Sequence, residues 1–312
     1  MSAPEWARAG RRQAGYRLLG PGLAYLLHTR PAEWPIMAAH TTLGSILAVG
    51  LDGIMRGERL GPALAGLGAW VIGLNGGTLA VNSAFDRDEG DVAYLRSPPP
   101  PPRRLFAFGV GLMLAGLGVA CLLSRSYLAA YAICLVMSLA YSVPPLRLKA
   151  VAGADWVINM WGFGTLTPFA GWAATGTAVS PAGWLVLLAF CPLFAAFYPL
   201  TQLYQMDEDR RRGDRTLALR LGARRSLIVA AVCASLAFAL LAAAGVRAGW
   251  RVGDDVCRWA LLAAAALGWF GVLAPWLTGA ARWSPSAHQR AMYGALGAWA
   301  VTDVAVAVAW GT

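Results

Sequence analysis

Charged side chains are scarce in this chain. They make up 13% of its 312 residues, whereas a soluble domain carries about a quarter. Hydrophobic residues account for 58%, and the mean hydropathy is +0.53. Apolar runs of about 20 residues recur along the whole length. These features exclude an ordinary soluble domain and predict an all-α, multi-pass integral membrane protein.

Histidine and cysteine are also few, at three and five residues. They show neither CxxC nor Cys/His spacing, which excludes a zinc site and a disulfide framework, and the cysteines read as packing residues. The net charge of +10 comes almost wholly from arginine, since Lys149 is the one lysine. In a membrane chain, such charge indicates topology rather than a nucleic-acid partner, and we expect no nucleic acid.

No secretory signal peptide opens the chain, because its first 20 residues are basic and only weakly apolar. Residues 1–30 place Tyr16, Leu18 and Leu19 among arginines. This pattern predicts a basic amphipathic helix at the membrane surface; the alternative is a disordered basic arm. Residues 31–312 then form a single transmembrane domain, because no polar linker is long enough to divide them.

The apolar runs predict nine transmembrane helices. We place them at about 33–54, 62–85, 104–123, 126–143, 153–175, 181–204, 225–246, 257–279 and 289–311. With the N-terminus inside, basic residues on the inner side outnumber those outside by about three to one, which is a clear orientation signal. The N-terminus and the loops after the second, fourth and sixth helices are therefore expected on the cytoplasmic side.

Half of the 16 carboxylates lie in two short clusters at the cytoplasmic ends of the second and sixth predicted helices. The clusters contain Asp86, Asp88, Glu89, Asp91, Asp207, Glu208, Asp209 and Asp214. Acids at the edge of a bilayer are costly unless something compensates for them. Clustered hard oxygens favour a divalent cation, and Mg²⁺ usually takes substrate phosphate as a further ligand. The clusters therefore predict a membrane enzyme that acts on a diphosphate.

If each cluster continues its helix, one face carries Asn82, Asp86 and Glu89, and another carries Gln202, Gln205 and Asp209. Two such faces turned toward each other form a cage of oxygen ligands at a central chamber that opens to the cytoplasm. We expect Arg147, Lys149 and Arg215 to complete the site with positive charge. The alternative is that the acids only pair with neighbouring arginines.

These residues also resemble the motifs of the UbiA superfamily of intramembrane prenyltransferases. The first motif is similar to residues 82–91 and the second to Asp209 with the Gly213-to-Leu217 stretch after it. A third is similar to the turn from Tyr141 to Lys149, and Arg30 to Pro35 is similar to the family's start. The resemblance covers residues 30–310 and is specific for the superfamily, but not for a substrate.

The chain departs from the family pattern in two places. Gly90 and Gln205 stand where acids are usual. Glu89 or Asp91 must then substitute in the first motif, and Asp207 and Glu208 in the second. The metal ligands are therefore expected to be Asp86, Glu89, Asp91, Asp207, Glu208 and Asp209.

The resemblance implies transfer of an isoprenyl group from a prenyl diphosphate to a hydrophobic or aromatic acceptor, with Mg²⁺ as cofactor. Its implied catalytic set is Asn82, Asp86, Tyr141, Arg147, Lys149 and Asp209. Aromatic faces stabilise an allylic cation, and Tyr141, Tyr198 and Tyr204 flank the polar motifs. Asn159 is a polar residue at membrane depth that either touches the acceptor or bonds another helix. The expected substrate-binding set is Asn159, Tyr198, Gln202, Tyr204, Gln205 and Arg215.

Two other functions fit the same pattern. A terpene cyclase on this scaffold would ionise the diphosphate without an external acceptor, and a transporter or lipid-phosphate binder would use the acids as a vestibule. The acceptor stays open among a quinone ring precursor, a chlorin or haem, a glycerol ether and a small aromatic acid. Prenyl length and oligomeric state also stay open.

Overall fold

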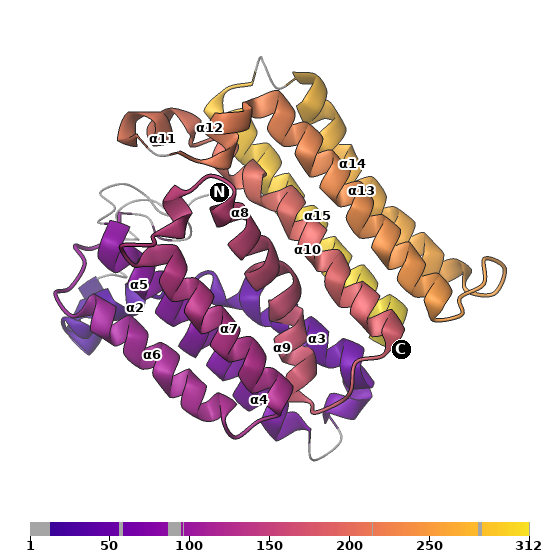
Figure 1. Cartoon of the computed structure of the whole chain (residues 1–312), viewed down its shortest axis with the longest axis horizontal. Coiled ribbons are helices and arrows are strands. Elements are labelled where there is room, and N and C mark those ends of the chain that lie inside the picture. The colour runs from indigo at the N-terminus through magenta and orange to yellow at the C-terminus, as the bar shows by residue number, and fades with distance from the viewer. Residues whose placement is uncertain are drawn as a thin grey trace.

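The computed structural model describes residues 13–55, 59–86, 95, 97–213, 215–279 and 283–311, without the side chains of Glu208 and Arg212. These residues fold into helices joined by turns and loops (Figure 1). The helices of the first half are α2 (Gly22–His28), α3 (Trp34–Met55), α4 (Leu60–Gly68), η1 (Ala69–Gly76), α5 (Gly77–Asp86), α6 (Leu105–Ala120) and α7 (Arg125–Ser142). Those that follow are η2 (Leu148–Ala150), α8 (Ala154–Asn159), η3 (Met160–Leu166), α9 (Thr167–Ala174), α10 (Pro181–Leu203), α11 (Met206–Arg212), α12 (Leu217–Leu221), α13 (Ala223–Arg247), α14 (Val256–Gly279) and α15 (Pro285–Gly311).

Each apolar range predicted from the sequence coincides with a helical segment. The largest offset is at the start of α15, which was predicted at residue 289 and begins at Pro285. Two of the segments contain a π-helical stretch: η1 joins α4 to α5, and η3 joins α8 to α9. In the described residues, six helices are long and apolar enough to cross a membrane. The protein is therefore an all-helical, multi-pass membrane protein.

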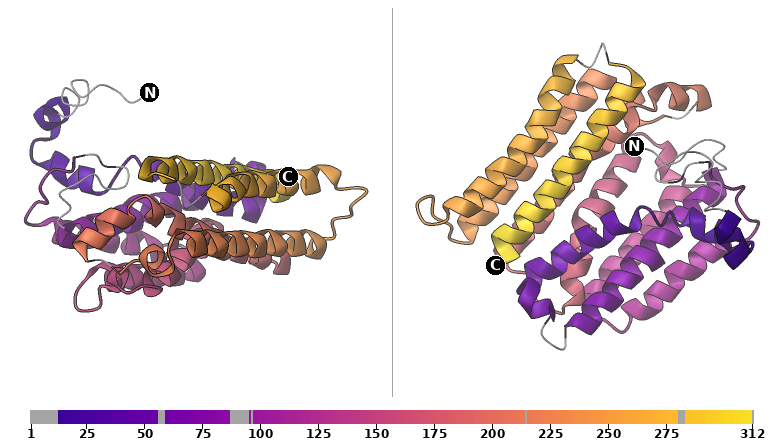
Figure 2. Two further views of the ribbon diagram at one scale, coloured as in Figure 1. Left: turned by 90° about the horizontal axis from the view of Figure 1, so that it is seen from above. Right: turned by 180° about the vertical axis from the view of Figure 1, so that it is seen from behind.

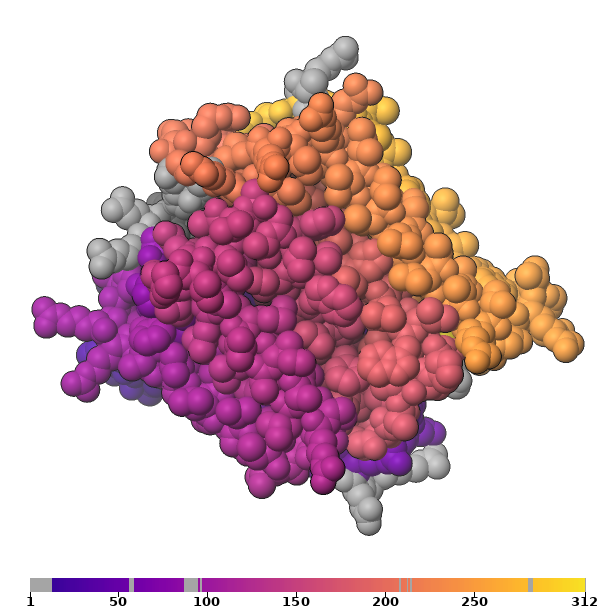
Figure 3. All heavy atoms as spheres, in the orientation of Figure 1, coloured from indigo at the N-terminus to yellow at the C-terminus, as the bar shows by residue number. Residues whose placement is uncertain are grey.

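The helices form two halves, each with its own apolar core. One core lies among η1, α6, α7 and α9 and contains Trp70, Tyr127 and Tyr131. The other lies among α10, α13, α14 and α15 and contains Trp269 and Trp276. Figure 1 shows the first half in indigo and magenta and the second in orange and yellow, and Figure 3 shows their side chains meeting on that face. A cavity between two separately packed halves keeps rigid walls.

Small residues allow the closest helix crossings. A Cβ added at Gly44 of α3 would lie 1.7 Å from the carbonyl oxygen of Pro168, and one at Gly171 of α9 would lie 1.8 Å from that of Thr41. The Ser45 hydroxyl donates to the Gly171 carbonyl at 2.8 Å across this crossing. Helices at such short separation are typical of membrane bundles, where small residues take the place of larger packing groups.

On the far side of the molecule, α3 and α15 lie next to each other (Figure 2). Gly50 has a φ of 70° inside α3, and a Cβ there would lie 3.2 Å from the carbonyl oxygen of Gly311. The positive φ explains why glycine stands at this bend. This contact joins the first transmembrane helix to the last and closes the bundle.

The segment before α3 is helical in its described part. Residues 13–19 and 22–28 form two short helices, while residues 1–12 lie outside the described residues. Leu18 is 84% exposed. His28 Nε2 lies 3.1 Å from the carbonyl oxygen of Pro99, in the non-helical proline run before α6. This contact holds α2 against the loop between α5 and α6.

Candidate active site

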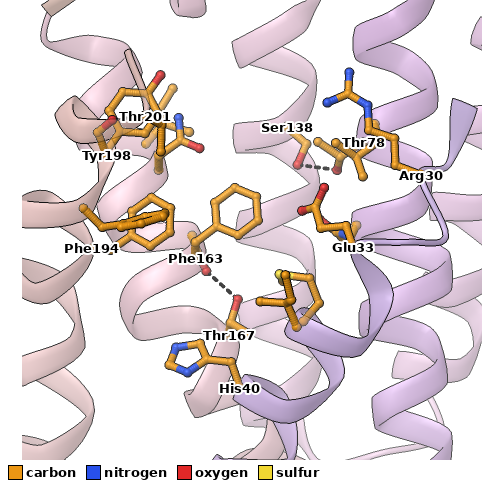
Figure 4. A pocket seen from close by; sticks show the side chains of 18 of the residues that line it. Arg30, Glu33, His40, Thr78, Ser138, Phe163, Thr167, Phe194, Tyr198 and Thr201 are labelled. Atoms are coloured by element: carbon orange, nitrogen blue, oxygen red, sulfur yellow. Dashed lines mark hydrogen bonds between the residues drawn. The ribbon is translucent and has the colours of Figure 1, made fainter. Parts of the chain in front are cut away.

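A cavity of about 400 Å³ lies between the two halves. Its lining comes from the end of the N-terminal segment, α3, η1, α5, α7, α8, η3, α9, α10 and α15. Figure 4 shows a wall with Tyr198, Thr201 and Phe194 facing another with Arg30 and Glu33. Both π-helical stretches contribute to the lining, and such irregular turns are common at functional sites.

The first acidic motif has the predicted geometry in its described part. Helix α5 continues to Asp86, so Asn82 and Asp86 share a face. Asp86 contacts Lys149 Nζ and lies 3.5 Å from Arg147 Nη2. The amide oxygen of Asn82 accepts from Lys149 Nζ at 3.1 Å and from the Ser142 hydroxyl at 3.3 Å. The turn after α7 therefore brings two cations onto the motif, as the sequence predicted.

The prediction that one continuous helix carries the second motif is wrong. Helix α10 ends at Leu203, and Gln205 lies in a turn that precedes the separate helix α11. Gln202 therefore does not share a continuous helical face with Gln205 and Asp209. The Gln205 carbonyl oxygen accepts from the Asp209 backbone N–H at 2.9 Å, which leaves this residue a role in starting α11.

The two described acids of α11 differ in their surroundings. Asp209 Oδ2 accepts from the Thr216 hydroxyl at 3.3 Å. Asp207 is exposed and pairs with Arg210 at 2.9 Å, and its role as a metal ligand stays a prediction. Arg215 is exposed. Both motifs nevertheless lie at the same end of the bundle (Figure 1), as the predicted topology requires.

Asp155, which the sequence analysis did not select, joins the cavity wall to the second motif. It is 1% exposed and stands in the first turn of α8. Its Oδ2 accepts from the Tyr198 hydroxyl at 3.3 Å and from Gln202 Nε2 at 3.2 Å, and its Oδ1 accepts from the Gly153 backbone N–H at 2.8 Å. Gln202 Oε1 in turn accepts from the Ala218 backbone N–H at 3.0 Å. A buried carboxylate thus fixes α8, α10 and α12 together.

The aromatic residues expected to face a cation lie on the cavity. Tyr141 and Tyr198 line it with their hydroxyls 3.4 Å apart, and Tyr204 lines it at the end of α10. Phe163 and Phe194 stack with centroids 5.3 Å apart. The lining of this space is mainly apolar, which suits an isoprenyl chain.

Asn159 also lines the cavity, but its amide nitrogen donates to the Asp155 carbonyl oxygen at 2.7 Å within its own helix. That bond is local and does not reach another helix. A side-chain hydrogen bond also links Asn159 to Tyr141 of α7, as in the alternative in which Asn159 bonds another helix, and substrate contact stays a prediction.

His40 and Asp303 form a buried pair at a deeper point of the cavity wall. His40 Nδ1 lies 3.1 Å from both carboxylate oxygens of Asp303, and His40 Nε2 lies 3.3 Å from the Gly164 carbonyl oxygen. Both ring nitrogens therefore have a polar partner within the protein. The intramembrane acid Asp303 therefore has a partner on α3 and a role in holding α15.

The donor chemistry at the mouth of the cavity fits Mg²⁺. Asn82 and Asp86 offer an amide oxygen and a carboxylate, which are ligands that this ion prefers. Within the described residues, no three His, Cys, Asp or Glu side chains come together as a metal cluster. Three predicted ligands lie outside the described residues, namely Glu89, Asp91 and the side chain of Glu208. The complete ligand set stays a prediction.

Arg30 and Glu33 are further cavity residues that sequence reasoning did not select as site residues. They lie in the turn just ahead of α3, and Arg30 is 7% exposed. The one available signal was their position in the Arg30-to-Pro35 stretch that precedes the first long apolar run. Two ionisable residues beside a hydrophobic chamber are costly to keep there, and such residues are candidates for function.

Comparison with known proteins agrees with this geometry. Residues 38–296 match the model of the UbiA prenyltransferase family. The chain is 31% identical over 224 residues to digeranylgeranylglyceryl phosphate synthase of Methanopyrus kandleri, covering 70% of this chain and 76% of that protein. The structure of a UbiA homologue from Archaeoglobus fulgidus bound to DMAPP and Mg²⁺ superposes with a TM-score of 0.67 at 20% identity, over 90% of this chain and 99% of the other. A UbiA homologue from Aeropyrum pernix has a TM-score of 0.62 at 18% identity, over 91% and 97%.

Proposed function

Because the chain belongs to the UbiA prenyltransferase family, we propose that it transfers an isoprenyl group from a prenyl diphosphate to a lipophilic acceptor and releases diphosphate. This proposal rests on one observation: the same cavity contains a charged environment and an aromatic, mainly apolar one. Asn82, Asp86 and the cations Arg147 and Lys149 stand at its mouth, and its interior is lined by aromatic rings. A diphosphate fits the first environment and a hydrocarbon chain the second.

The residues at the mouth act on the leaving group. Lys149 and Arg147 neutralise the negative charge that grows on the diphosphate as the allylic C–O bond breaks. Asn82 and Asp86, with Asp209 on the second motif, would hold Mg²⁺. When bound, the ion supplies further neutralisation of the diphosphate oxygens. In this structure Lys149 is paired with the Asp86 carboxylate. Substrate binding therefore requires this ion pair to be shared with the ligand or broken.

The residues of the interior act on the cation. The faces of Tyr141, Tyr198 and Phe194 surround the reacting carbon and stabilise its positive charge. The apolar walls also exclude water, which would otherwise capture the carbon as an alcohol. Tyr198 is held in place by its hydroxyl bond to Asp155.

The test uses purified protein in nanodiscs with geranylgeranyl diphosphate and Mg²⁺. The relative from Methanopyrus kandleri is named for a glycerol ether product, so geranylgeranylglyceryl phosphate is the first acceptor to assay, followed by an aromatic acid. We expect acceptor-dependent release of diphosphate and a prenylated product by mass spectrometry. Asp86→Asn should lose this activity, and chelation of Mg²⁺ should abolish it. A hydrocarbon formed without any acceptor would instead show a terpene cyclase.

We further propose that nine helices cross the membrane, with the N-terminus, the cavity mouth and both acidic motifs on the cytoplasmic side and residues 1–30 on the membrane surface. The support is the excess of basic residues at that end. Two exposed native cysteines, Cys121 and Cys257, lie at the ends of helices that this topology places outside. A membrane-impermeant thiol reagent should label both in intact cells and should label neither in the Cys121→Ser/Cys257→Ser variant. Labelling only after lysis would show that the orientation is opposite to the one proposed.

A further inference from the structure

Prenyl transfer to a hydroxyl leaves one proton to be removed, and the residues at the mouth do not provide for it. The carboxylate of Asp86 is occupied by Lys149 and Arg147. Asp155 uses both oxygens to accept from Gly153, Tyr198 and Gln202. A group that faces the space where the acceptor lies is better placed to accept the proton.

His40 is unsuited to this task although it lines the cavity. Its Nδ1 is directed at the carboxylate of Asp303, and its Nε2 is directed at the carbonyl oxygen of Gly164. Both ring nitrogens are thus engaged by groups of the protein rather than by a ligand in the cavity.

Glu33 is the one carboxylate among the described residues that line the cavity. Figure 4 shows it reaching inward from the wall opposite Tyr198 and Thr201, with Arg30 beside it. The same wall carries the hydroxyls of Thr78 and Ser138, which are hydrogen-bonded to each other at 2.9 Å. Hydroxyl and carboxyl groups so placed in an apolar cavity form a subsite for a polar part of a ligand.

The subsite lies at a useful distance from the diphosphate position. Asn75, which interacts with the Glu33 carboxyl, and Asn82 stand on the same continuous helix and both line the cavity. They are two turns apart, which corresponds to about 10 Å along the helix. An acceptor hydroxyl therefore fits between the leaving group at Asn82 and the carboxyl at Glu33.

We propose that Glu33 is the proton acceptor of the transfer. The acceptor's oxygen forms the new C–O bond with the allylic carbon, the C–O bond to diphosphate breaks, and the hydroxyl proton passes to the Glu33 carboxylate. The proton then leaves to water when the product departs. This inference rests on the proposed function and applies to an acceptor that reacts through a hydroxyl group.

The electrostatics of the subsite suit this role. Burial raises the pKa of Glu33 to about 7, and the charge of Arg30 and the amide of Asn75 oppose that effect only in part. A general base works best when its pKa lies near the working pH. Apart from Arg30, the other ionisable groups that line the cavity are a thiol, four phenols and an imidazole, namely Cys134, Tyr141, Tyr198, Tyr204, Tyr293 and His40.

The test compares wild type with Glu33→Gln, which keeps the shape of the side chain but cannot accept the proton. Substrates are geranylgeranyl diphosphate with Mg²⁺ and geranylgeranylglyceryl phosphate. We expect kcat to fall by about 100-fold or more, while KM for the diphosphate changes by less than about threefold. Wild-type kcat should rise with pH through about 7, because only the ionised carboxylate accepts a proton. Glu33→Gln should lose this rise, and Glu33→Asp should restore part of the rate.

The matched control is Asp254→Asn, which removes an exposed acid from the loop before α14 and should leave both profiles unchanged. If Glu33→Gln keeps the wild-type kcat and pH profile, Glu33 is not the proton acceptor, although prenyl transfer stands. If wild type itself forms no acceptor-dependent product, the proposed function fails, and the role of Glu33 fails with it.

Discussion

Replacing Asp155 by asparagine tests whether one buried carboxylate holds the cavity and the second motif together. The carboxylate accepts three hydrogen bonds, from the Gly153 backbone N–H, the Tyr198 hydroxyl and Gln202 Nε2. An asparagine has one oxygen and one NH₂ group. If the asparagine oxygen faces the Gly153 N–H, the asparagine NH₂ faces the NH₂ of Gln202, and two donors meet. In the opposite orientation the asparagine NH₂ faces the Gly153 N–H, and two donors meet there instead.

Gln202 cannot resolve this conflict by turning its own amide. Its Oε1 already accepts from the Ala218 backbone N–H at 3.0 Å, and a turned amide would place two donors there instead. One buried donor therefore loses its acceptor in every arrangement. The loss corresponds to about 1–3 kcal/mol in the free energy of unfolding.

The measurement is thermal and denaturant unfolding of Asp155→Asn in detergent, beside prenyl transfer kinetics in nanodiscs. We expect the lower stability stated above and a raised KM for the prenyl diphosphate, because Gln202 no longer fixes the start of α12. Asp254→Asn is again the control, since this acid is exposed. A stability of Asp155→Asn within about 0.5 kcal/mol of wild type, the usual range for surface changes, would refute the proposed network.

Three other predictions concern the mouth and the helix crossings. Lys149→Met should lower kcat/KM for the prenyl diphosphate by about 10–100-fold, since a charge-assisted contact is lost beside Asp86, and steady-state kinetics would show it. Gly44→Ala should lower the unfolding free energy by about 1–3 kcal/mol or more in denaturant unfolding, because its Cβ would lie 1.7 Å from a backbone oxygen. Gly111→Ala, where nothing lies within 4 Å, should leave stability unchanged or raise it by about 0.5–1 kcal/mol in the same assay.

The helices could be predicted closely because their apolar runs are long and uniform. A run of about 20 apolar residues specifies a membrane helix whatever its neighbours are. The π-helical stretches η1 and η3 could not be predicted in this way. They shift the register within a helix that stays apolar throughout, and only the packing of the neighbouring helices selects them.

The end of α10 shows the same limit at the site. Residues 200–209 contain neither glycine nor proline, so no local signal predicts the break after Leu203, and a continuous face through Gln205 and Asp209 was expected. The end of α11 does carry a signal, since Gly213 has a φ of 76°. Gln202 leaves the predicted face because Asp155 and Ala218 offer it buried partners.

Spacing also decided which site residues could be found. Asn82 and Asp86 are one helical turn apart and belong to an acidic cluster, so their common face follows from the sequence alone. Glu33 and Asp155 are single acids that belong to no acidic cluster in the sequence. Their importance comes from burial and from contacts with residues 40 or more positions away, which only the folded chain reveals.

The placement of charge in the cavity separates two tasks that would conflict at one position. A cation near the leaving group stabilises diphosphate, but it would weaken a base by lowering its pKa. Lys149 and Arg147 stand at the mouth beside Asp86, whereas Glu33 lies about two helical turns away along the Asn75–Asn82 helix, where the charge of the neighbouring Arg30 only partly offsets the rise in pKa that burial causes. The rings of Tyr141, Tyr198 and Phe194 also line the cavity and can face a carbon that is briefly positive. The two charges that leave the reacting atoms, first with diphosphate and then with the proton, are thus received at separate positions.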